Sequence, residues 1–467
     1  MPICFYNSLT RRAEEFRPLH EGEVRMYTCG PTVHDFAHIG NFRAYAWEDL
    51  LRRHLEARGL HVTHVMNITD VEDKIIRKAA EAGVDIREWT ARFTAGFFED
   101  VDTLRLLRAQ HYPRATEHIP EMLALIRSLE ERGHTYVADG SVYFRIASFA
   151  EYGRLSGLDR DKLLVGARVD SDEYAKEDPA DFVLWKAARP GEPAWDSPWG
   201  PGRPGWHIEC SAMSMKYLGD TFDLHTGGVD NKFPHHENEI AQSEAATGLP
   251  FVRHWMHCAH LLVNGEKMSK SLGNFYTLRD LLGRGCEPRH IRYVLVGTHY
   301  RKPLDFTFEA LDQARAELER IDNFRDRLAR QALAPAPALG ARIAEARAAF
   351  GAALDDDLNI SGATGEVFKL VREVNTALDR GEVGRQDARE IEAFLAEADR
   401  VVGALLPWQE EGAAPPEVLA LLDQRQAARA ARQWGEADRL RDEIAARGYV
   451  IEDTPQGPVL KKGGGRP

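Results

Sequence analysis

The chain has 467 residues, of which 43% are hydrophobic and 28% charged, and a formal net charge of −13. These values are typical of a globular protein, the length predicts about three or four domains, and the charge gives no sign of a nucleic-acid binder. No stretch approaches the ~20 apolar residues that cross a bilayer, the N-terminus lacks the order of a signal peptide, and the five cysteines form no CxxC pair. We therefore expect a cytoplasmic, reduced protein with no membrane partner.

The first predicted elements form a strand–helix–strand unit. The pattern predicts a strand over 24–29, a helix over 41–58 that stops at Gly59, and a returning strand over 61–68. Such a unit implies a parallel sheet with a right-handed crossover. Ligands of these sheets gather at the C-terminal ends of the strands, which is where Cys29, His38 and Thr69 fall.

The middle of the chain interrupts and then resumes this alternation. Residues 84–132 are mostly helical in pattern, 136–146 predict a hairpin about Asp139-Gly140, and 187–206 are rich in Pro, Gly and Trp and predict a loop. Helices are then expected near 207–218 and 235–247, with strands at 222–225 and 255–263. A nucleotide-binding sheet split by an insertion of roughly a hundred residues fits this order.

From about residue 307 the sequence becomes helical, rich in Ala, Arg and Glu, and then passes a linker into a short helix pair and strands. The predicted fold class is α/β: a split Rossmann-like parallel-sheet catalytic domain with an inserted connective segment, followed by a helical bundle and a small C-terminal α+β module. The predicted boundaries are 1–105 and 200–306 for the sheet domain, 106–199 for the connective segment, 307–407 for the bundle, 415–460 for the module and 461–467 for a disordered tail.

The loop at 264–274 contains two lysines three residues apart, Lys267 and Lys270, in a polar stretch after a turn dipeptide. Ammonium groups on such a loop can neutralise charge that develops on phosphate oxygens, although a solvated basic turn is the simpler alternative. Far upstream, His38 lies at the start of the first helix in the tetrapeptide that ends at Asn41. A helix N-terminus favours phosphate, and an imidazole there can donate to it, although an ordinary helix cap has the same appearance.

A second set of residues has the chemistry of a metal site. His235 and Glu239 are four apart on a predicted helix and so share a face, and Cys29 and Cys210 are thiols from elsewhere in the chain. Together they make a set of tetrahedral zinc ligands. Spacing alone leaves the alternative open, because nothing local pairs the two cysteines and buried cysteines are commonly small hydrophobes.

Five longer strings stand out: Tyr27-Thr28-Cys29-Gly30-Pro31-Thr32-Val33, Asn67-Ile68-Thr69-Asp70, Gly205-Trp206-His207-Ile208-Glu209-Cys210-Ser211, Phe233-Pro234-His235-His236-Glu237-Asn238-Glu239 and Glu452-Asp453-Thr454-Pro455-Gln456-Gly457. They resemble strings of the cysteinyl-tRNA synthetase family, a class I aminoacyl-tRNA synthetase family. His38-Ile39-Gly40-Asn41 and Lys267-Met268-Ser269-Lys270-Ser271 resemble the two class I signatures, with Asn41 where a second histidine is usual. The resemblance runs from about residue 3 to residue 460.

The resemblance implies activation of L-cysteine by ATP with Mg²⁺ and transfer of cysteine to tRNA-Cys by a monomer. It implies one Zn²⁺ held by Cys29, Cys210, His235 and Glu239, and catalytic roles for His38, Asn41, Lys267 and Lys270. ATP would be bound by His38, Gly40, Asn41, Gly228, Asp230 and the two lysines, and cysteine by Cys29, Gly30, Thr69, Trp206 and His225. The bundle and the C-terminal module would bind tRNA, the module through Arg425, Trp434, Asp438 and Asp453.

Three other functions remain open at this point. A ligase that joins cysteine to an amino sugar, as in the mycothiol pathway, would share the zinc and both signatures, but such relatives resemble a truncated synthetase. A zinc hydrolase could use His235-His236-Glu237-Asn238-Glu239, which lacks the His-Glu-x-x-His order. A non-catalytic RNA-binding descendant would have no need of His38 and the lysines.

Overall fold

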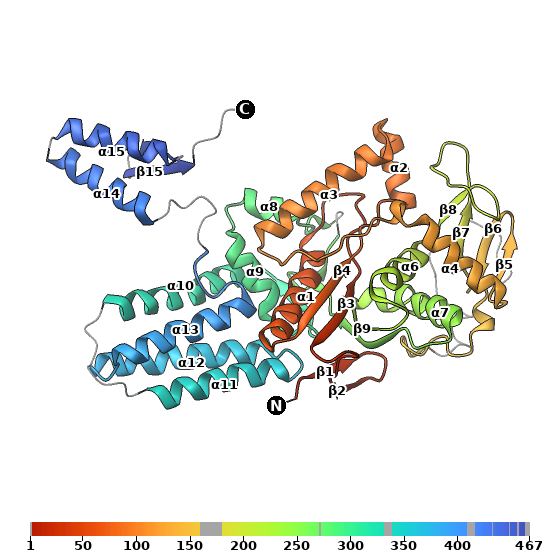
Figure 1. Cartoon of the computed structure of the whole chain (residues 1–467), viewed down its shortest axis with the longest axis horizontal. Coiled ribbons are helices and arrows are strands. Elements are labelled where there is room, and N and C mark those ends of the chain that lie inside the picture. The colour runs from red at the N-terminus through yellow and green to blue at the C-terminus, as the bar shows by residue number, and fades with distance from the viewer. Residues whose placement is uncertain are drawn as a thin grey trace. The chain divides into compact units, whose positions relative to one another are not determined.

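The computed structural model describes residues 2–158, 180–269, 272–330, 339–408, 416–431, 433–447, 449–454 and 457–462. The chain divides into two compact units, Met1–Leu406 and Pro407–Pro467, each with its own core (Figure 1). Within the described ranges, no helix is both long and apolar enough to cross a membrane.

A four-stranded parallel sheet organises the first unit. Its order is β10 (Val252–Cys258), β9 (Phe222–Gly228), β3 (Glu23–Thr28) and β4 (His61–Met66); the sequence predicts strands here and a parallel sheet, but not this order. The helix α1 (Ile39–Ala57) crosses from β3 to β4 and packs Trp47 and Leu51 on one face of the sheet, while α6 (Trp206–Leu218) and α7 (His235–Thr247) pack on the other (Figure 1). All four strands therefore end at the same edge.

The predicted strand over 255–263 is interrupted in the structure. β10 ends at Cys258, and a separate strand β11 (Leu261–Val263) follows in a second small sheet with β12 (Glu266–Lys267) and β13 (Leu304–Phe306). Neither glycine nor proline stands at the break, which falls at Ala259-His260, so the pattern could not mark the change of sheet. Between β12 and β13 lie α8 (Leu278–Gly283) and α9 (Pro288–Gly297).

The inserted part consists of helices and an antiparallel sheet. α2 (Asp73–Ala82), α3 (Ile86–Thr103) and α4 (Ile119–Glu131) precede the sheet β5 (Thr135–Ala138), β6 (Ser141–Phe144), β7 (Phe182–Ala187) and β8 (Gly202–Pro204). The predicted hairpin is confirmed, with positive φ angles of 47° at Asp139 and 75° at Gly140.

The prediction that 187–206 is wholly a loop is wrong, because β8 pairs with β7 there. As an edge strand, β8 tolerates a proline and a glycine that would exclude it from the middle of a sheet. The pairing also places residues 202–204 with the inserted sheet rather than with the domain predicted to resume at residue 200.

The remaining elements of the first unit are a small N-terminal hairpin and a helical bundle. The hairpin is formed by β1 (Cys4–Asn7) and β2 (Arg12–Glu15), which the sequence analysis did not predict. The helices α10 (Phe308–Arg330), α11 (Gly340–Asp355), α12 (Ile360–Asp379) and α13 (Arg385–Val402) lie side by side (Figure 1). Two arginines join α1 to the bundle: Arg58, the C-cap of α1, forms a bidentate pair with Asp355, and Arg53 of α1 donates to the carbonyl of Arg400.

The second unit is a helix pair followed by a β-hairpin: α14 (Pro416–Ala430), α15 (Trp434–Ala446), β14 (Tyr449–Thr454) and β15 (Gly457–Lys462). Its core is small and includes Val418 and Ile444. Lys461 and Lys462 pair with β14, so their assignment to a disordered tail is wrong, whereas 463–467 lie outside the described residues.

Candidate active site

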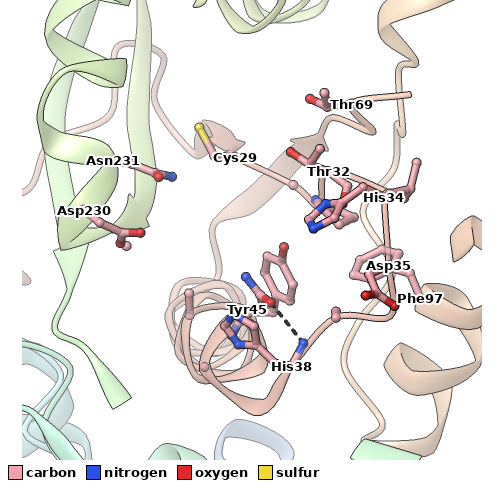
Figure 2. A pocket seen from close by; sticks show the side chains of 18 of the residues that line it. Cys29, Thr32, His34, Asp35, His38, Tyr45, Thr69, Phe97, Asp230 and Asn231 are labelled. Carbon is pink, nitrogen blue, oxygen red and sulfur yellow. Dashed lines mark hydrogen bonds between the residues drawn. The ribbon is translucent and has the colours of Figure 1, made fainter. Parts of the chain in front are cut away.

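A cavity of about 550 Å³ opens at the C-terminal edge of the parallel sheet (Figure 2). Most of the predicted site residues of the first unit line it: Cys29, Gly30, His38, Gly40, Asn41, Thr69, Trp206, Cys210, Gly228, Asp230, His235 and Lys267. Cys29 follows β3, Thr69 follows β4, and Gly228 ends β9, so the strand ends bring these segments together. In Figure 2, Asp230 and Asn231 lie across the cavity from Thr69 and His34.

The thiols, imidazole and carboxylate predicted as metal ligands converge on one point. The ligand atoms of Cys29, Cys210, His235 and Glu239 all lie within 4.8 Å of one another, and Cys210, His235 and Glu239 are buried. His235 and Glu239 occupy consecutive turns of α7, with Nε2 and Oε1 3.1 Å apart. Cys29 reaches them from the end of β3, and Cys210 from α6, which packs beside α7.

A second group shares two of these ligands. Cys29, His225, His236 and Glu239 also have ligand atoms within 4.8 Å of one another. His236 Nε2 lies 3.2 Å from Cys29 Sγ, and its Nδ1 lies 2.9 Å from His257 Nε2. His225 Nε2 lies 2.9 Å from Glu239 Oε2, and its ring stacks on Trp255. His225, which the resemblance assigns to cysteine binding, does not line the cavity, and neither do His236 and Glu239; all three are buried.

Burial drives this cluster toward neutral forms. It raises the pKa of the Cys29 thiol and of the Glu239 carboxyl well above their usual values. It lowers the pKa of His235 and His236 well below the usual range, and that of His225 to about 3. Neutral imidazole is the form that binds a metal, and a divalent cation supplies the positive charge that two thiolates and a carboxylate need when buried. The donor set therefore fits a metal ion.

The residues beside this cluster are held by a hydrogen-bonded chain. The Gly30 N–H donates to Asn67 Oδ1 (2.8 Å), Asn67 Nδ2 to Thr69 Oγ1 (3.2 Å), and Thr69 Oγ1 to Glu209 Oε2 (3.1 Å). A Cβ at position 30 would lie 1.8 Å from the carbonyl oxygen of Asn67, which explains the glycine. Trp206, the first residue of α6, stacks on His235 with ring centroids 4.0 Å apart.

His38 is the N-cap of α1 and forms a reciprocal capping box with Asn41. The Asn41 N–H donates to His38 Nδ1 (3.2 Å), and the His38 N–H donates to Asn41 Oδ1 (3.1 Å). Because a backbone N–H can only donate, Nδ1 is an acceptor, and the neutral ring carries its proton on Nε2. The amide oxygen of Asn41 serves the cap, which leaves its NH₂ group for the cavity.

The lysine loop and the residues that follow it contact the start of α1. The Ile39 N–H donates to the carbonyl of Tyr276 (2.9 Å), and Phe275 meets the His38 ring edge-on. A Cβ at Gly40 would lie 2.6 Å from Met268 Cε, so the glycine admits this close approach. Lys267 ends β12 and lines the cavity, whereas Lys270 lies outside the described residues.

Several residues of the site escaped sequence reasoning. Asn67, Glu209 and His236 stand inside the quoted strings but had no role assigned to them. His34 and Asp35, which line the cavity, follow the string 27–33 directly, and Asp35 pairs with Lys78 (2.9 Å). Their position shortly after the first predicted strand could have identified them as site residues.

The candidate residues of the second unit differ in exposure. Trp434 begins α15 and is 59% exposed, and Asp438, one turn later, is exposed and pairs with Arg441. Arg425 on α14 is buried. Asp453 lies in β14, and its side chain is outside the described part.

Comparison with known proteins bears on both units. The profile described as the tRNA synthetases class I (C) catalytic domain matches residues 15–316, which is more than half of the chain. The DALR domain matches 349–406, and the cysteinyl-tRNA ligase anticodon binding domain matches 411–457. The chain belongs to the cysteinyl-tRNA synthetase family.

Full-length relatives agree with this assignment. The cysteine–tRNA ligase of Solibacter usitatus is 50% identical over 99% of this chain and 100% of its own length, and that of Chlamydia pneumoniae is 49% identical over 98% of each. Among solved structures, methionyl-tRNA synthetase of Mycobacterium tuberculosis, in complex with methionyl-adenylate, aligns with a TM-score of 0.59 over 81% of this chain and 89% of its own. At 16% identity, that likeness bears on the fold alone and supports the predicted α/β class I architecture.

Proposed function

We propose that the protein activates L-cysteine with ATP, releasing pyrophosphate, and transfers the cysteinyl group to the terminal adenosine of tRNA-Cys. The observation that carries the proposal is a single cavity with the thiol–imidazole–carboxylate cluster at one side and the His38 cap and Lys267 strand at another. Full-length relatives and the match of the second unit to an anticodon-binding domain favour this function over the amino-sugar ligase and the hydrolase.

Zn²⁺ is the proposed metal, and Cys29, Cys210, His235 and Glu239 are its proposed ligands. When bound, zinc offers a site that takes a soft thiolate in strong preference to a neutral hydroxyl, which separates cysteine from serine where shape alone gives little discrimination. His225 and His236 support this set by their contacts with Glu239 and Cys29. Gly30, Thr69 and Trp206 form the surrounding wall of the cysteine pocket.

The activation step is in-line attack of the cysteine carboxylate on the α-phosphate of ATP. A carboxylate C–O–P bond forms and the bond to the pyrophosphate oxygen breaks, without a protein nucleophile. His38 donates from Nε2–H to phosphate oxygens, and the Asn41 NH₂ group donates beside it. Lys267 and Lys270, with Mg²⁺ bound to ATP, neutralise charge on the departing pyrophosphate.

The adenosine part of ATP is assigned to the segment after β9. Gly228 lines the cavity and is proposed to let the nucleotide approach the backbone closely; a Cβ there would also lie 2.4 Å from Asp230 Oδ1. Asp230 is proposed to accept ribose hydroxyls, and Gly40, at the start of α1, is proposed to lie beside the phosphates; both residues line the cavity.

The tRNA is assigned to the bundle at 307–407 and to the module at 415–460. Trp434 is the proposed stacking platform for a base, and Asp438, Asp453 and Arg425 are the proposed polar contacts. We further propose a cytoplasmic monomer and transfer to the 2′-hydroxyl of the terminal ribose.

Charging of labelled cysteine onto total tRNA, with ATP and Mg²⁺, tests the proposal. An RNase-sensitive, alkali-labile cysteinyl product is expected. Cysteine-dependent ATP–pyrophosphate exchange without any charging of tRNA from the same source would contradict the transfer function. Absence of both reactions in zinc-loaded protein would contradict the activation step as well.

A further inference from the structure

A second lysine lines the active-site cavity besides Lys267: Lys74, on the first turn of α2. The carboxylates around it are already engaged. Asp35 pairs with Lys78, Asp73 pairs with Lys186 (2.8 Å) and with Arg203, and Glu72 accepts the backbone N–H of Lys74. Among the described residues, Lys74 Nζ has neither an ion pair nor a hydrogen bond.

The turn that carries Lys74 is firmly held. Lys186 and Arg203, the partners of Asp73, belong to β7 and β8 and are 7% and 3% exposed. Upstream, Asp70 accepts hydrogen bonds from the backbone N–H and the hydroxyl of Thr116. The segment from Thr69 to Lys74 is thus fixed to the inserted part of the chain, and a cation on a fixed turn is presented without a large loss of backbone freedom.

Three anions enter this cavity in the proposed reactions: the phosphates of ATP, the cysteine carboxylate and the phosphodiester at the 3′ end of the acceptor strand. The proposed function assigns the phosphates to His38 and Lys267. A cation held on the carboxylate would stabilise the ground state of the nucleophile and slow its attack. The phosphodiester has no other partner assigned to it, and the chain's net charge of −13 opposes its approach.

We propose that Lys74 binds the phosphodiester that precedes the terminal adenosine of the acceptor strand. This inference rests on the proposed function. This phosphodiester is attached to the 5′ oxygen of the same ribose whose hydroxyl is acylated, so the contact orients that hydroxyl toward the adenylate during transfer and has no part in activation.

The test compares Lys74→Ala, Lys74→Arg and the control Arg77→Ala, whose side chain is exposed on the same helix and lies 3.8 Å from Glu81. For Lys74→Ala, kcat/KM for tRNA is expected to fall about 10- to 100-fold, as for loss of a hydrogen bond to a charged group. The slope of log kcat/KM against log salt concentration is expected to become shallower by about one. Lys74→Arg should restore both values in large part, and Arg77→Ala should match the wild type.

Two measurements decide between the anions. Lys74→Ala should keep cysteine-dependent pyrophosphate exchange within about twofold of the wild type, which also shows that the variant folds. The second measurement uses an RNA acceptor that carries a neutral methylphosphonate at the last linkage. The wild type should charge this acceptor more slowly than the normal one, whereas Lys74→Ala should charge the two at similar rates. A fall in exchange, or additive losses with the methylphosphonate acceptor, would overturn the proposal. If the wild type charged no tRNA at all, the proposed function itself would fail instead.

Discussion

The two units present their candidate contacts in opposite ways. In the first unit, Cys210, His235 and Glu239 are buried, touch one another and are supported by further histidines. In the second unit, Trp434 and Asp438 are exposed on one helix over a small core. A buried cluster holds its ligand atoms in a fixed geometry, so the loss of one member should disable the site. An exposed surface adds separate contacts, and single losses there should be graded.

Cys210→Ser should have the largest effect, because it removes a buried member of the cluster. We expect loss of stoichiometric zinc and a fall of more than about 10³-fold in kcat/KM for cysteine, since even the residues that support metal ligands are worth about 10–100-fold. Elemental analysis and pyrophosphate exchange measure the two quantities. Cys286→Ser, outside the cluster, is the control and should keep its metal. Unchanged zinc content in Cys210→Ser would refute the ligand assignment.

Lys267→Ala should rank second, since it removes charge stabilisation but leaves the cluster intact. We expect the activation rate to fall about 10²–10³-fold with little change in the Kd of free cysteine, because the interaction strengthens as charge develops. Single-turnover formation of the adenylate measures the activation rate, and equilibrium binding measures the Kd of free cysteine. Lys270→Ala should behave alike. Normal turnover in either variant would contradict the role assigned to that lysine.

Trp434→Ala tests the surface side of the comparison. Loss of one stacked base should raise the KM for tRNA about 5- to 100-fold, with pyrophosphate exchange unchanged. The matched control is Leu419→Ala, which removes another large exposed apolar side chain of the same unit and should leave the KM alone. If both variants retain the wild-type KM, Trp434 does not stack on the tRNA.

The smallest expected effect concerns Asp100, which pairs with Arg279 and so joins α3 to α8, just after the lysine loop. Burial raises the pKa of Asp100 from 3.8 to about 6. The folded protein therefore binds this proton more tightly than the unfolded chain does. The contribution to stability is complete below about pH 4 and is lost as the pH rises through 6.

Asp100→Asn should flatten the change in urea midpoint between pH 4 and pH 7. Glu99→Gln, at the exposed neighbour that also contacts Arg279, is the control and should retain the wild-type pH dependence. If the urea midpoint of Asp100→Asn changed with pH as much as that of the wild type, other groups would be responsible for the pH dependence of stability.

Much of the architecture was predictable because its signals are local. The apolar stripe of α1, its stop at Gly59 and the His38 cap all depend on residues within a few positions of one another, and the structure confirms the helix. β8 was missed because strand pairing uses the backbone, so a Gly- and Pro-containing segment can pair at an edge without an apolar pattern. The break between β10 and β11 was missed because no glycine or proline separates the two strands.

By itself, the sequence determined the alternation of strands and helices, the pairing of His235 with Glu239 on one helix face, and the resemblance that identifies the family. Only the tertiary structure decided that Cys29 and Cys210 meet that face, that His225 contacts Glu239, and that Lys74 lines the cavity. The reason is physical. Periodicity reports which side of its own element a residue occupies, whereas the convergence of β3, α6 and α7 on one point depends on how their cores pack.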